Sequence, residues 1–233
     1  DFFYDGLDTD CDGSDRTRYD LADSLMYVEG TGTRTDLVGR GLDLCDFDED
    51  GLLDLVISNQ NGTLNVCLGS VADTWTCSSN GLSGRHRGVA VEDFDGDGHL
   101  DIIGTIETMS NMDVCLGDGT GGFSCTREPA PNGGRNIAVA DFTGNGEPDM
   151  LYAAWPGPSA LCENDGAANF TCTSLAGSSG SDLGVGLGDF NGDGNADVAL
   201  ASYSGTTQIC LGDGVGVLTC SPLGAGTQLA SVA

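Results

Sequence analysis

The sequence contains no lysine, and its eight basic residues, all arginine, face 36 acidic residues. The resulting formal net charge of −28 over 233 residues repels phosphate backbones and anionic lipid surfaces. We therefore expect neither nucleic acid nor an anionic membrane as a partner. Bound cations would offset part of this acidity, although adaptation to high salt produces the same composition.

Helical and membrane-spanning patterns are also missing. Proline is scarce, with six residues, and no glycine-free stretch of three turns places apolar residues at helical spacing. No apolar run approaches the roughly 20 residues that a membrane helix needs, so we expect no membrane insertion. No signal-peptide pattern precedes Asp1, which we expect to be a processed or truncated start. The 38 glycines instead favour many short strands joined by tight turns.

Cysteine, by contrast, is abundant and regularly placed. Eight of the ten cysteines form four pairs, each ten residues apart. With no CxxC pattern and only two histidines, zinc is a poor explanation, and disulfides in an exported protein are the better one. Cys11 and Cys45 remain, and a bond between them is the simplest expectation. The four spaced pairs are Cys67 with Cys77, Cys115 with Cys125, Cys162 with Cys172, and Cys210 with Cys220.

A nine-residue acidic pattern recurs four times with a period of about 48 residues. Alternating oxygen-bearing side chains on a tightly curled loop converge on one point. A glycine at the sixth position lets the backbone turn, and an Asp at the ninth closes the shell. Such hard oxygen ligands suit Ca²⁺. The copies are DFDEDGLLD (46–54), DFDGDGHLD (93–101), DFTGNGEPD (141–149) and DFNGDGNAD (189–197).

We expect about four calcium ions, held by the first, third, fifth and ninth side chains and by the seventh carbonyl. The formal ligand charges are −4, −4, −2 and −3, so the third site should bind most weakly. A complete oxygen shell leaves no open position for substrate, so the expected role is structural. The ligand sets are Asp46, Asp48, Asp50, Leu52 and Asp54; Asp93, Asp95, Asp97, His99 and Asp101; Asp141, Thr143, Asn145, Glu147 and Asp149; and Asp189, Asn191, Asp193, Asn195 and Asp197.

Each acidic loop lies between two short apolar strands, and a cysteine-bearing hairpin follows. Directly opposed cysteines ten apart require an odd-length turn, which glycine-rich turns of three or five residues supply. Four strands per repeat predict β-propeller blades, with a plain stack of sheets as the alternative. The expected strand pairs around the loops are Gly41–Cys45 with Leu55–Ser58, Gly88–Glu92 with Ile102–Ile106, Asn136–Ala140 with Met150–Ala154, and Gly184–Gly188 with Val198–Ser202.

The four segments resemble FG-GAP/VCBS repeats, the blades of the integrin α-subunit propeller and of many bacterial surface proteins. The DxDxDGxxD loops carry this resemblance, which covers roughly residues 41–221. It implies an all-β, calcium-binding propeller of four-stranded antiparallel blades. Integrin-like propellers have seven blades, whereas this chain shows four complete repeats.

The two ends together resemble one further blade that has been cut open. Thr227–Ala233 aligns with the first strand of a blade, and Asp20–Ser24 resembles a second strand. The ends could meet within one molecule, join copies head-to-tail, or continue in a longer polypeptide. We therefore divide the chain into an N-terminal segment (1–40), four blades (41–226) and a closing or donated strand (227–233).

The N-terminal segment contains another acidic loop. Asp8, Asp10 and Asp12, followed by Gly13, are similar to a metal-binding motif of bacterial surface proteins, although the next carboxylate, Asp15, comes one position early. This loop is a candidate fifth calcium site, and a disordered acidic start is the alternative.

Several other features have competing interpretations. The GDGTGG stretch at 117–122 satisfies GxGxxG but falls at a hairpin tip, which excludes the dinucleotide fold. Arginines at equivalent positions could hold an anionic or carbohydrate ligand, or could pair with acidic neighbours; Trp75 and Trp155 are sugar platforms or packing residues. Asn61 and Asn169 begin N-glycosylation sequons. The equivalent arginines are Arg40, Arg87 and Arg135.

These observations predict a secreted, non-catalytic module at an extracellular surface, acting in adhesion or structure. Head-to-tail self-assembly into a fibre and closure of a five-bladed ring within one molecule are the two alternatives for its ends. Its expected partners are other surface proteins, copies of itself or glycans. The alternatives are a carbohydrate-binding propeller and, more remotely, an accessory domain of a larger secreted enzyme. No GxSxG nucleophile motif occurs.

Overall fold

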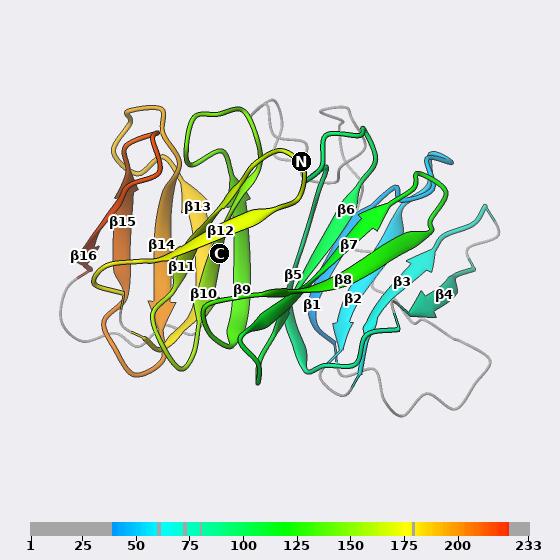
Figure 1. The fold of residues 1–233 in the computed structure, drawn as a ribbon, viewed down its shortest axis with the longest axis horizontal. Helices are drawn as coiled ribbons and strands as arrows, with labels where there is room; N and C mark the ends of the chain where they lie inside the picture. The colour runs from blue at the N-terminus through cyan, green and yellow to red at the C-terminus, as the bar shows by residue number, and fades with distance from the viewer. Residues whose placement is uncertain (1–38, 60–61, 72–73, 80, 179, 224–233) are drawn as a thin grey trace.

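Sixteen strands and no helix make up the part of the chain that the computed structural model describes, namely residues 39–59, 62–71, 74–79, 81–178 and 180–223. The strands form four four-stranded antiparallel sheets (Figure 1). They are β1 (Gly39–Cys45), β2 (Asp54–Asn59), β3 (Leu64–Leu68) and β4 (Thr76–Ser79); β5 (His86–Glu92), β6 (Asp101–Ile106), β7 (Asn111–Gly117) and β8 (Phe123–Pro129); β9 (Gly134–Ala140), β10 (Asp149–Ala154), β11 (Ala160–Asn164) and β12 (Phe170–Ser174); and β13 (Asp182–Gly188), β14 (Asp197–Ser202), β15 (Gln208–Gly212) and β16 (Leu218–Pro222).

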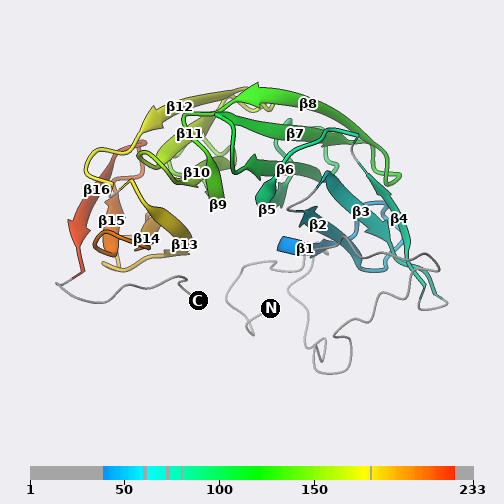
Figure 2. The same ribbon diagram turned by 90° about the horizontal axis from the view of Figure 1, so that it is seen from below.

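The sheets follow one another around an arc. Within each sheet the strands pair in chain order, as a simple meander. Figure 2 shows β1, β5, β9 and β13 on the inside of the arc and the last strand of each sheet on the outside. The all-β prediction and the four four-stranded units are confirmed. A closed ring of sheets is not present among the described residues, so these residues do not establish the propeller itself.

The first strand of each sheet begins two residues earlier than the sequence pattern predicts. A register shift lies near the start of β1, between Gly39 and Gly41, and comparable shifts occur in the other three sheets. A bulge interrupts the alternation of side chains, so the pattern fails to reveal the residues before it. The second strands begin one residue earlier than expected, because the ninth residue of each acidic loop is already paired with the first strand.

The hydrophobic core lies between neighbouring sheets. All six residues of each second strand are buried, in the two end sheets of the arc as well as in the two middle ones. Between the first two sheets, for example, Phe47 and Val56 pack with Val91 and Ile102. Burying each such side chain contributes about 1.5–3 kcal/mol. The last strands are mostly exposed or half-buried, in agreement with their place on the outside.

Each hairpin carries the expected disulfide. In all four hairpins the spaced cysteines are directly opposed in the strand register and bonded to each other, which confirms the predicted pairing. The second, third and fourth hairpins have five-residue turns, the odd length that such opposition requires. The bonds join Cys67 with Cys77 across β3 and β4, Cys115 with Cys125 across β7 and β8, Cys162 with Cys172 across β11 and β12, and Cys210 with Cys220 across β15 and β16.

The remaining two cysteines were expected to bond to each other. Cys45 is fully buried at the end of β1. Its expected partner, Cys11, lies outside the described residues, so that bond remains a prediction.

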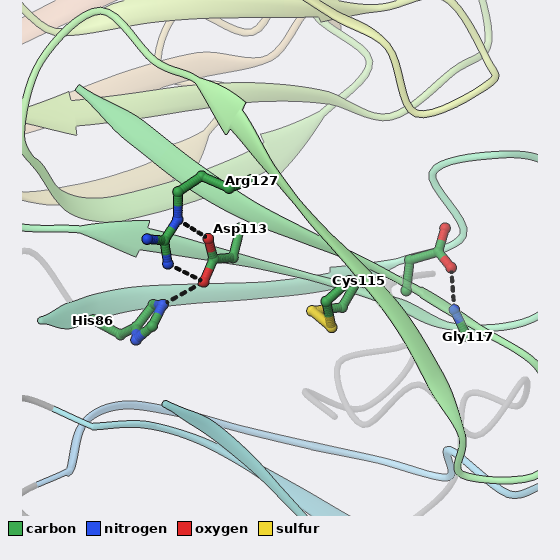
Figure 3. The surroundings of a disulfide bond; sticks show 7 residues. His86, Asp113, Cys115, Gly117 and Arg127 are labelled. Carbon is green, nitrogen blue, oxygen red and sulfur yellow. Dashed lines mark hydrogen bonds and ion pairs between the residues drawn. A yellow bond between two sulfur atoms is a disulfide. The ribbon is translucent and has the colours of Figure 1, made fainter. Parts of the chain in front are cut away.

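A buried polar network joins the first two sheets (Figure 3). Asp113 of β7 accepts hydrogen bonds from His86 Nε2 at 2.9 Å and from Arg127 Nε at 2.8 Å. The other ring nitrogen of His86 lies 3.1 Å from the carbonyl oxygen of Gly62 in the first repeat. Burial raises the pKa of Asp113, but the hydrogen bonds from His86 and Arg127 outweigh it and hold the pKa below its usual range.

Removing the centre of this network should strongly destabilise the fold. We expect Asp113→Ala to lower the free energy of unfolding by about 3–5 kcal/mol, because it leaves the buried His86 and the partly buried Arg127 without their shared acceptor. Urea unfolding at pH 7 measures the loss. Glu163→Ala, at an exposed strand position, is the control and should change the value by about 0.5 kcal/mol or less. Equal effects of the two variants would contradict this role.

Candidate metal centre

The four acidic loops occupy equivalent positions, because each joins the first strand of its sheet to the second. The first Asp of each loop curls the backbone around its own carboxylate. In the second loop, Asp93 Oδ1 accepts from the N–H groups of Gly96 and Asp97, and Oδ2 accepts from that of Gly98 at 2.9 Å. The third and fourth loops repeat all three bonds. The first carboxylate therefore sets the curvature that brings the other side chains together.

Two positions in each loop require a left-handed backbone. The sixth is always glycine, as at Gly98 with φ of 93°. The fourth is glycine in three loops, but in the first it is Glu49, with φ of 58°. A non-glycine residue in this region is conformationally unfavourable. The Glu49 carboxylate lies 2.6 Å from Nδ1 of His99 in the second loop. The hydrogen bond that the ring donates to Glu49, more than any other contact, raises the pKa of His99.

The ninth Asp uses both of its oxygens within the protein. Asp101 Oδ2 accepts from the N–H of Phe94 at 2.9 Å, and Oδ1 accepts from the N–H of Gly117, at the end of β7, at 2.8 Å. The equivalent pair of bonds is present in all four repeats. Each of these carboxylates is fully buried. A residue expected only as a metal ligand thus also ties the loop to the third strand.

The second residue of each loop, always Phe, reaches the next sheet. The ring of Phe94 meets that of Phe170 edge-on, with centroids 5.7 Å apart, and its carbonyl accepts from the N–H of Ala168 at the tip of the β11–β12 hairpin. Phe47 and Phe142 make the same carbonyl contact with the hairpin tips of their own next sheets. This contact was not predicted from the sequence, although the repeated Asp-Phe dipeptide is the signal that could have revealed it.

The oxygen atoms of the loops fit a hard cation. One carboxylate oxygen from each of Asp46, Asp48 and Asp50 lie within 4.8 Å of one another. A second such cluster is formed by Asp93, Asp95 and Asp101. Burial, followed by the charges of Asp95 and Asp93, raises the pKa of Asp101 to about 6. A cation placed among these groups would remove the repulsion that raises it.

Two oxygen atoms at the third loop position point to the same conclusion. Asp48 Oδ1 and Thr143 Oγ1 are buried and have no hydrogen-bond partner within the part of the chain that the structure describes. A buried oxygen without a partner is costly unless something else satisfies it. A metal ion held by the loop would do so in both cases. The residues present therefore fit the expected ion on grounds other than their sequence pattern.

The third and fourth loops have amide side chains in place of some carboxylates, and these amides form hydrogen bonds within the protein. In the fourth, Asn191 Nδ2 donates to Asp193 Oδ2 at 2.9 Å, so the amide nitrogen occupies one carboxylate oxygen. In the third, Asn145 Nδ2 donates to the carbonyl of Asn164 at 3.2 Å. The seventh residues, expected to offer only their carbonyls, place their backbone N–H groups on the fifth side chain in all four loops.

Other residues singled out by the sequence take varied positions. Trp75 packs against the cluster of Leu55, Ile57 and Cys67, which supports its interpretation as a packing residue. Arg87 and Arg135 both pair with Glu107, as the plainer alternative for them predicts. The side chain of Arg40, the N-terminal loop with Asp8, Asp10 and Asp12, the tail from 224 onward and the sequon at Asn61 lie outside what the structure describes. Asn169 is exposed, and its use for glycosylation stays a prediction.

The fold and loops define a repeat protein built from small β-sheets joined through acidic loops, and comparison with known families agrees. The FG-GAP-like repeat family matches residues 46–104, 93–152 and 141–200, together about two thirds of the chain. The chain belongs to this family. Each match begins at the first Asp of a loop and runs into the following repeat.

Comparison with individual proteins adds little. No curated protein matches the chain. Among solved structures, the biofilm matrix protein Bap1 of V. cholerae is similar at 18% identity and a TM-score of 0.45, over 74% of this chain. The chain spans only about 30% of the length of that protein. Within the described residues, no helix has the length and apolar character needed to cross a membrane.

The double hydrogen bond of the ninth Asp can be separated from metal binding by working in excess chelator. We expect Asp101→Ala to lower the free energy of unfolding by about 2 kcal/mol or more, because two buried N–H groups lose their acceptor at about 1–3 kcal/mol each. Asp97→Ala, on the exposed part of the same loop, should cost less than about 1 kcal/mol. Urea unfolding in EDTA compares them. Equal losses would show that Asp101 has no role beyond that of a ligand.

Proposed function

We propose that this chain is a secreted, non-catalytic β-propeller module, stabilised by calcium, that serves adhesion or structure at an extracellular surface and joins copies of itself head-to-tail. One observation carries this proposal: within the described part of the chain, the contact between a loop Phe and the next sheet is made three times and left open at the fourth sheet. Membership of the FG-GAP-like repeat family and the four hairpin disulfides support a surface protein in an oxidising compartment.

The fourth sheet presents the same surface as the others, but no sheet among the described residues follows it. Phe47, Phe94 and Phe142 are 0–3% exposed, whereas Phe190 is 49% exposed. Leu211, on the same side of β15, is 38% exposed, while its equivalents Leu68 and Leu116 pack into the cores between sheets. The fourth sheet thus has the surface that the other sheets use to pack against a following blade. We infer that the first repeat of a second copy supplies it, with residues 1–40 and 227–233 completing the joint.

Calcium is the ion that this proposal assigns to the loops. All of the candidate ligands are oxygen atoms, and the first two loops contribute four carboxylates each. Calcium accepts six to eight such oxygens in a flexible geometry, whereas Mg²⁺ demands a stricter octahedron. The ion would link the first strand, the second strand and, through the loop Phe, the next sheet. Its role would be to hold the blades rigidly, with the N-terminal loop as a candidate fifth site.

Other functions have less support. An accessory domain of a larger secreted enzyme has no observation of its own in its favour. A nucleotide site at 117–122 does not fit the structure, because these residues form the turn between β7 and β8. Carbohydrate binding is favoured by one specific feature, an exposed aromatic pair, Trp155 and Tyr203, beside a cluster of arginines.

Thermal melting tests the calcium proposal. At a free calcium concentration a hundred times the dissociation constant, each site would add about 2.7 kcal/mol to the free energy of unfolding. In a chain of this size, each added kcal/mol raises the melting temperature by about 2–4 °C. We therefore expect the melting temperature to fall markedly in EDTA and to recover with calcium more than with magnesium. Asp97→Ala should reduce the calcium-dependent gain more than Thr143→Ala, because it removes a charge from a −4 site. A melting temperature indifferent to calcium would refute the structural role.

Paired phenylalanine variants test the assembly. Phe142→Ala should lower stability by about 3–5 kcal/mol, as for any large buried aromatic residue. Phe190→Ala should leave the stability of the single chain nearly unchanged but abolish higher assemblies, seen by sedimentation and negative-stain imaging. Deleting residues 227–233 should do the same. A chain that stays monomeric at all concentrations, and is destabilised equally by both Phe variants, would instead have closed its ring within one molecule.

A further inference from the structure

A cluster of basic and aromatic residues lies at the edge of the arc opposite the acidic loops. Arg87 and Arg135 are the second residues of β5 and β9, at the far end of those strands from the loops. Glu107, Trp155 and Tyr203 each follow the last residue of a second strand, at equivalent positions in three successive repeats. The meander therefore brings arginines from two sheets and side chains from three sheets to one edge. We call Arg85, Arg87, Glu107, Arg135, Trp155 and Tyr203 the arginine–aromatic surface.

Its charge is opposite to that of the rest of the protein. Arg87 donates to Glu107 through Nε at 2.9 Å and Nη2 at 2.7 Å, and Arg135 donates to the same carboxylate. Arg85 Nη2 lies 3.5 Å from it. Three of the eight arginines in a chain of net charge −28 thus surround a single carboxylate, which leaves a local excess of positive charge. The hydrogen bond from Arg87, opposed by burial and aided by Arg135, lowers the pKa of Glu107 to about 2, so it stays ionised.

The central arginine is not fully satisfied. The Arg135 side chain is 6% exposed, and its Nη1 donates to Glu107. Its Nε is buried and has no hydrogen-bond partner among the described residues. A guanidinium carries five N–H donors, so a buried one with so few acceptors is unusual. Arg85, whose side chain is 47% exposed, offers further donors at the outer side of the same cluster. Arg85 is therefore the accessible donor for a second carboxylate, and the buried Arg135 adds positive charge beside it.

Two exposed aromatic rings extend the surface beside this cation. The Arg135 guanidinium lies 4.4 Å from the centroid of the Trp155 ring. Trp155 is 39% exposed and Tyr203 59% exposed, with ring centroids 6.5 Å apart and planes inclined at 52°. Exposed aromatic rings that gather next to each other usually mark a binding surface. The positive charge and the ring faces are so close that one small chemical unit would meet both.

We propose that the arginine–aromatic surface binds a carboxylated saccharide. The ligand carboxylate pairs with Arg85, attracted also by the positive charge of the buried Arg135, and the apolar faces of its sugar rings stack on Trp155 and Tyr203. A sugar ring that carries its own carboxylate combines a charge and a flat apolar face within one unit, as the short distance between the arginines and the aromatic rings requires. An acidic peptide would use the arginines alone and leave the aromatic rings without a role. The site rests on the proposed function, since it names the ligand class through which the module adheres.

Binding of a galacturonic acid trisaccharide tests the proposal, with the neutral galactose trisaccharide as its matched probe. Isothermal titration calorimetry on the full chain in calcium should detect the acidic sugar and give at least a tenfold weaker constant for the neutral one. Arg85→Gln should weaken binding about fivefold or more, while Arg85→Lys retains most of it. Trp155→Ala should weaken it about tenfold. Glu107→Gln should strengthen it, because the competing carboxylate is gone.

Val217→Ala, at an exposed apolar position in the fourth hairpin, is the control and should leave binding unchanged. Equal binding of both sugars, no binding of the acidic sugar, or equally tight binding of triglutamate would each overturn the proposal. If the protein binds the acidic sugar but its melting temperature does not depend on calcium, the proposed calcium role is refuted and the sugar site stands. If melting depends on calcium but the sugar does not bind, the sugar site is refuted and the calcium role stands.

Discussion

The structure depends most on one repeated interaction, in which a buried carboxylate accepts two backbone N–H groups. Asp101 holds the start of its acidic loop through Phe94 and the end of β7 through Gly117. Without these bonds, the loop would not be fixed relative to the third strand of its sheet. Burying a carboxylate is costly, and hydrogen bonds to the charged form offset that cost only in part. A cation among the neighbouring carboxylates would offset the part of this cost that the hydrogen bonds leave.

The same residues connect one sheet to the next. The N–H of Phe94 donates to Asp101, its carbonyl accepts from the hairpin of the third sheet, and its ring packs against Phe170. Asn164 adds a second bond to the Phe94 carbonyl at 2.9 Å. Any change that loosens an acidic loop therefore acts on two sheets at once. In a repeat protein whose stability comes largely from contacts between neighbouring units, such a joint lets local ion binding stabilise the whole array.

Much of this arrangement could be predicted from sequence because it is local. The spacing of the cysteines determined the hairpin pairing, and the acidic loops located the turns between the first and second strands. What could not be predicted depends on contacts between sheets or on irregular backbone. The bulges near Gly41 and Val89 conceal the true strand starts. The shared partner of Arg87 and Arg135 lies on another strand, at a distance in sequence that no periodic pattern encodes.

Each first strand separates two chemically opposite sites. In β5, Arg87 lies at one end and the loop beginning with Asp93 follows the other, so at about 3.3 Å per residue some 20 Å separates them. That distance exceeds the screening length of about 8 Å at physiological salt, so the charge at one edge hardly affects the other. The repeat can therefore keep its loops for stability while the opposite edge varies, from Arg and Glu in one sheet to Leu183 and Tyr203 in another. Stability and recognition are thereby assigned to different ends of the same strands.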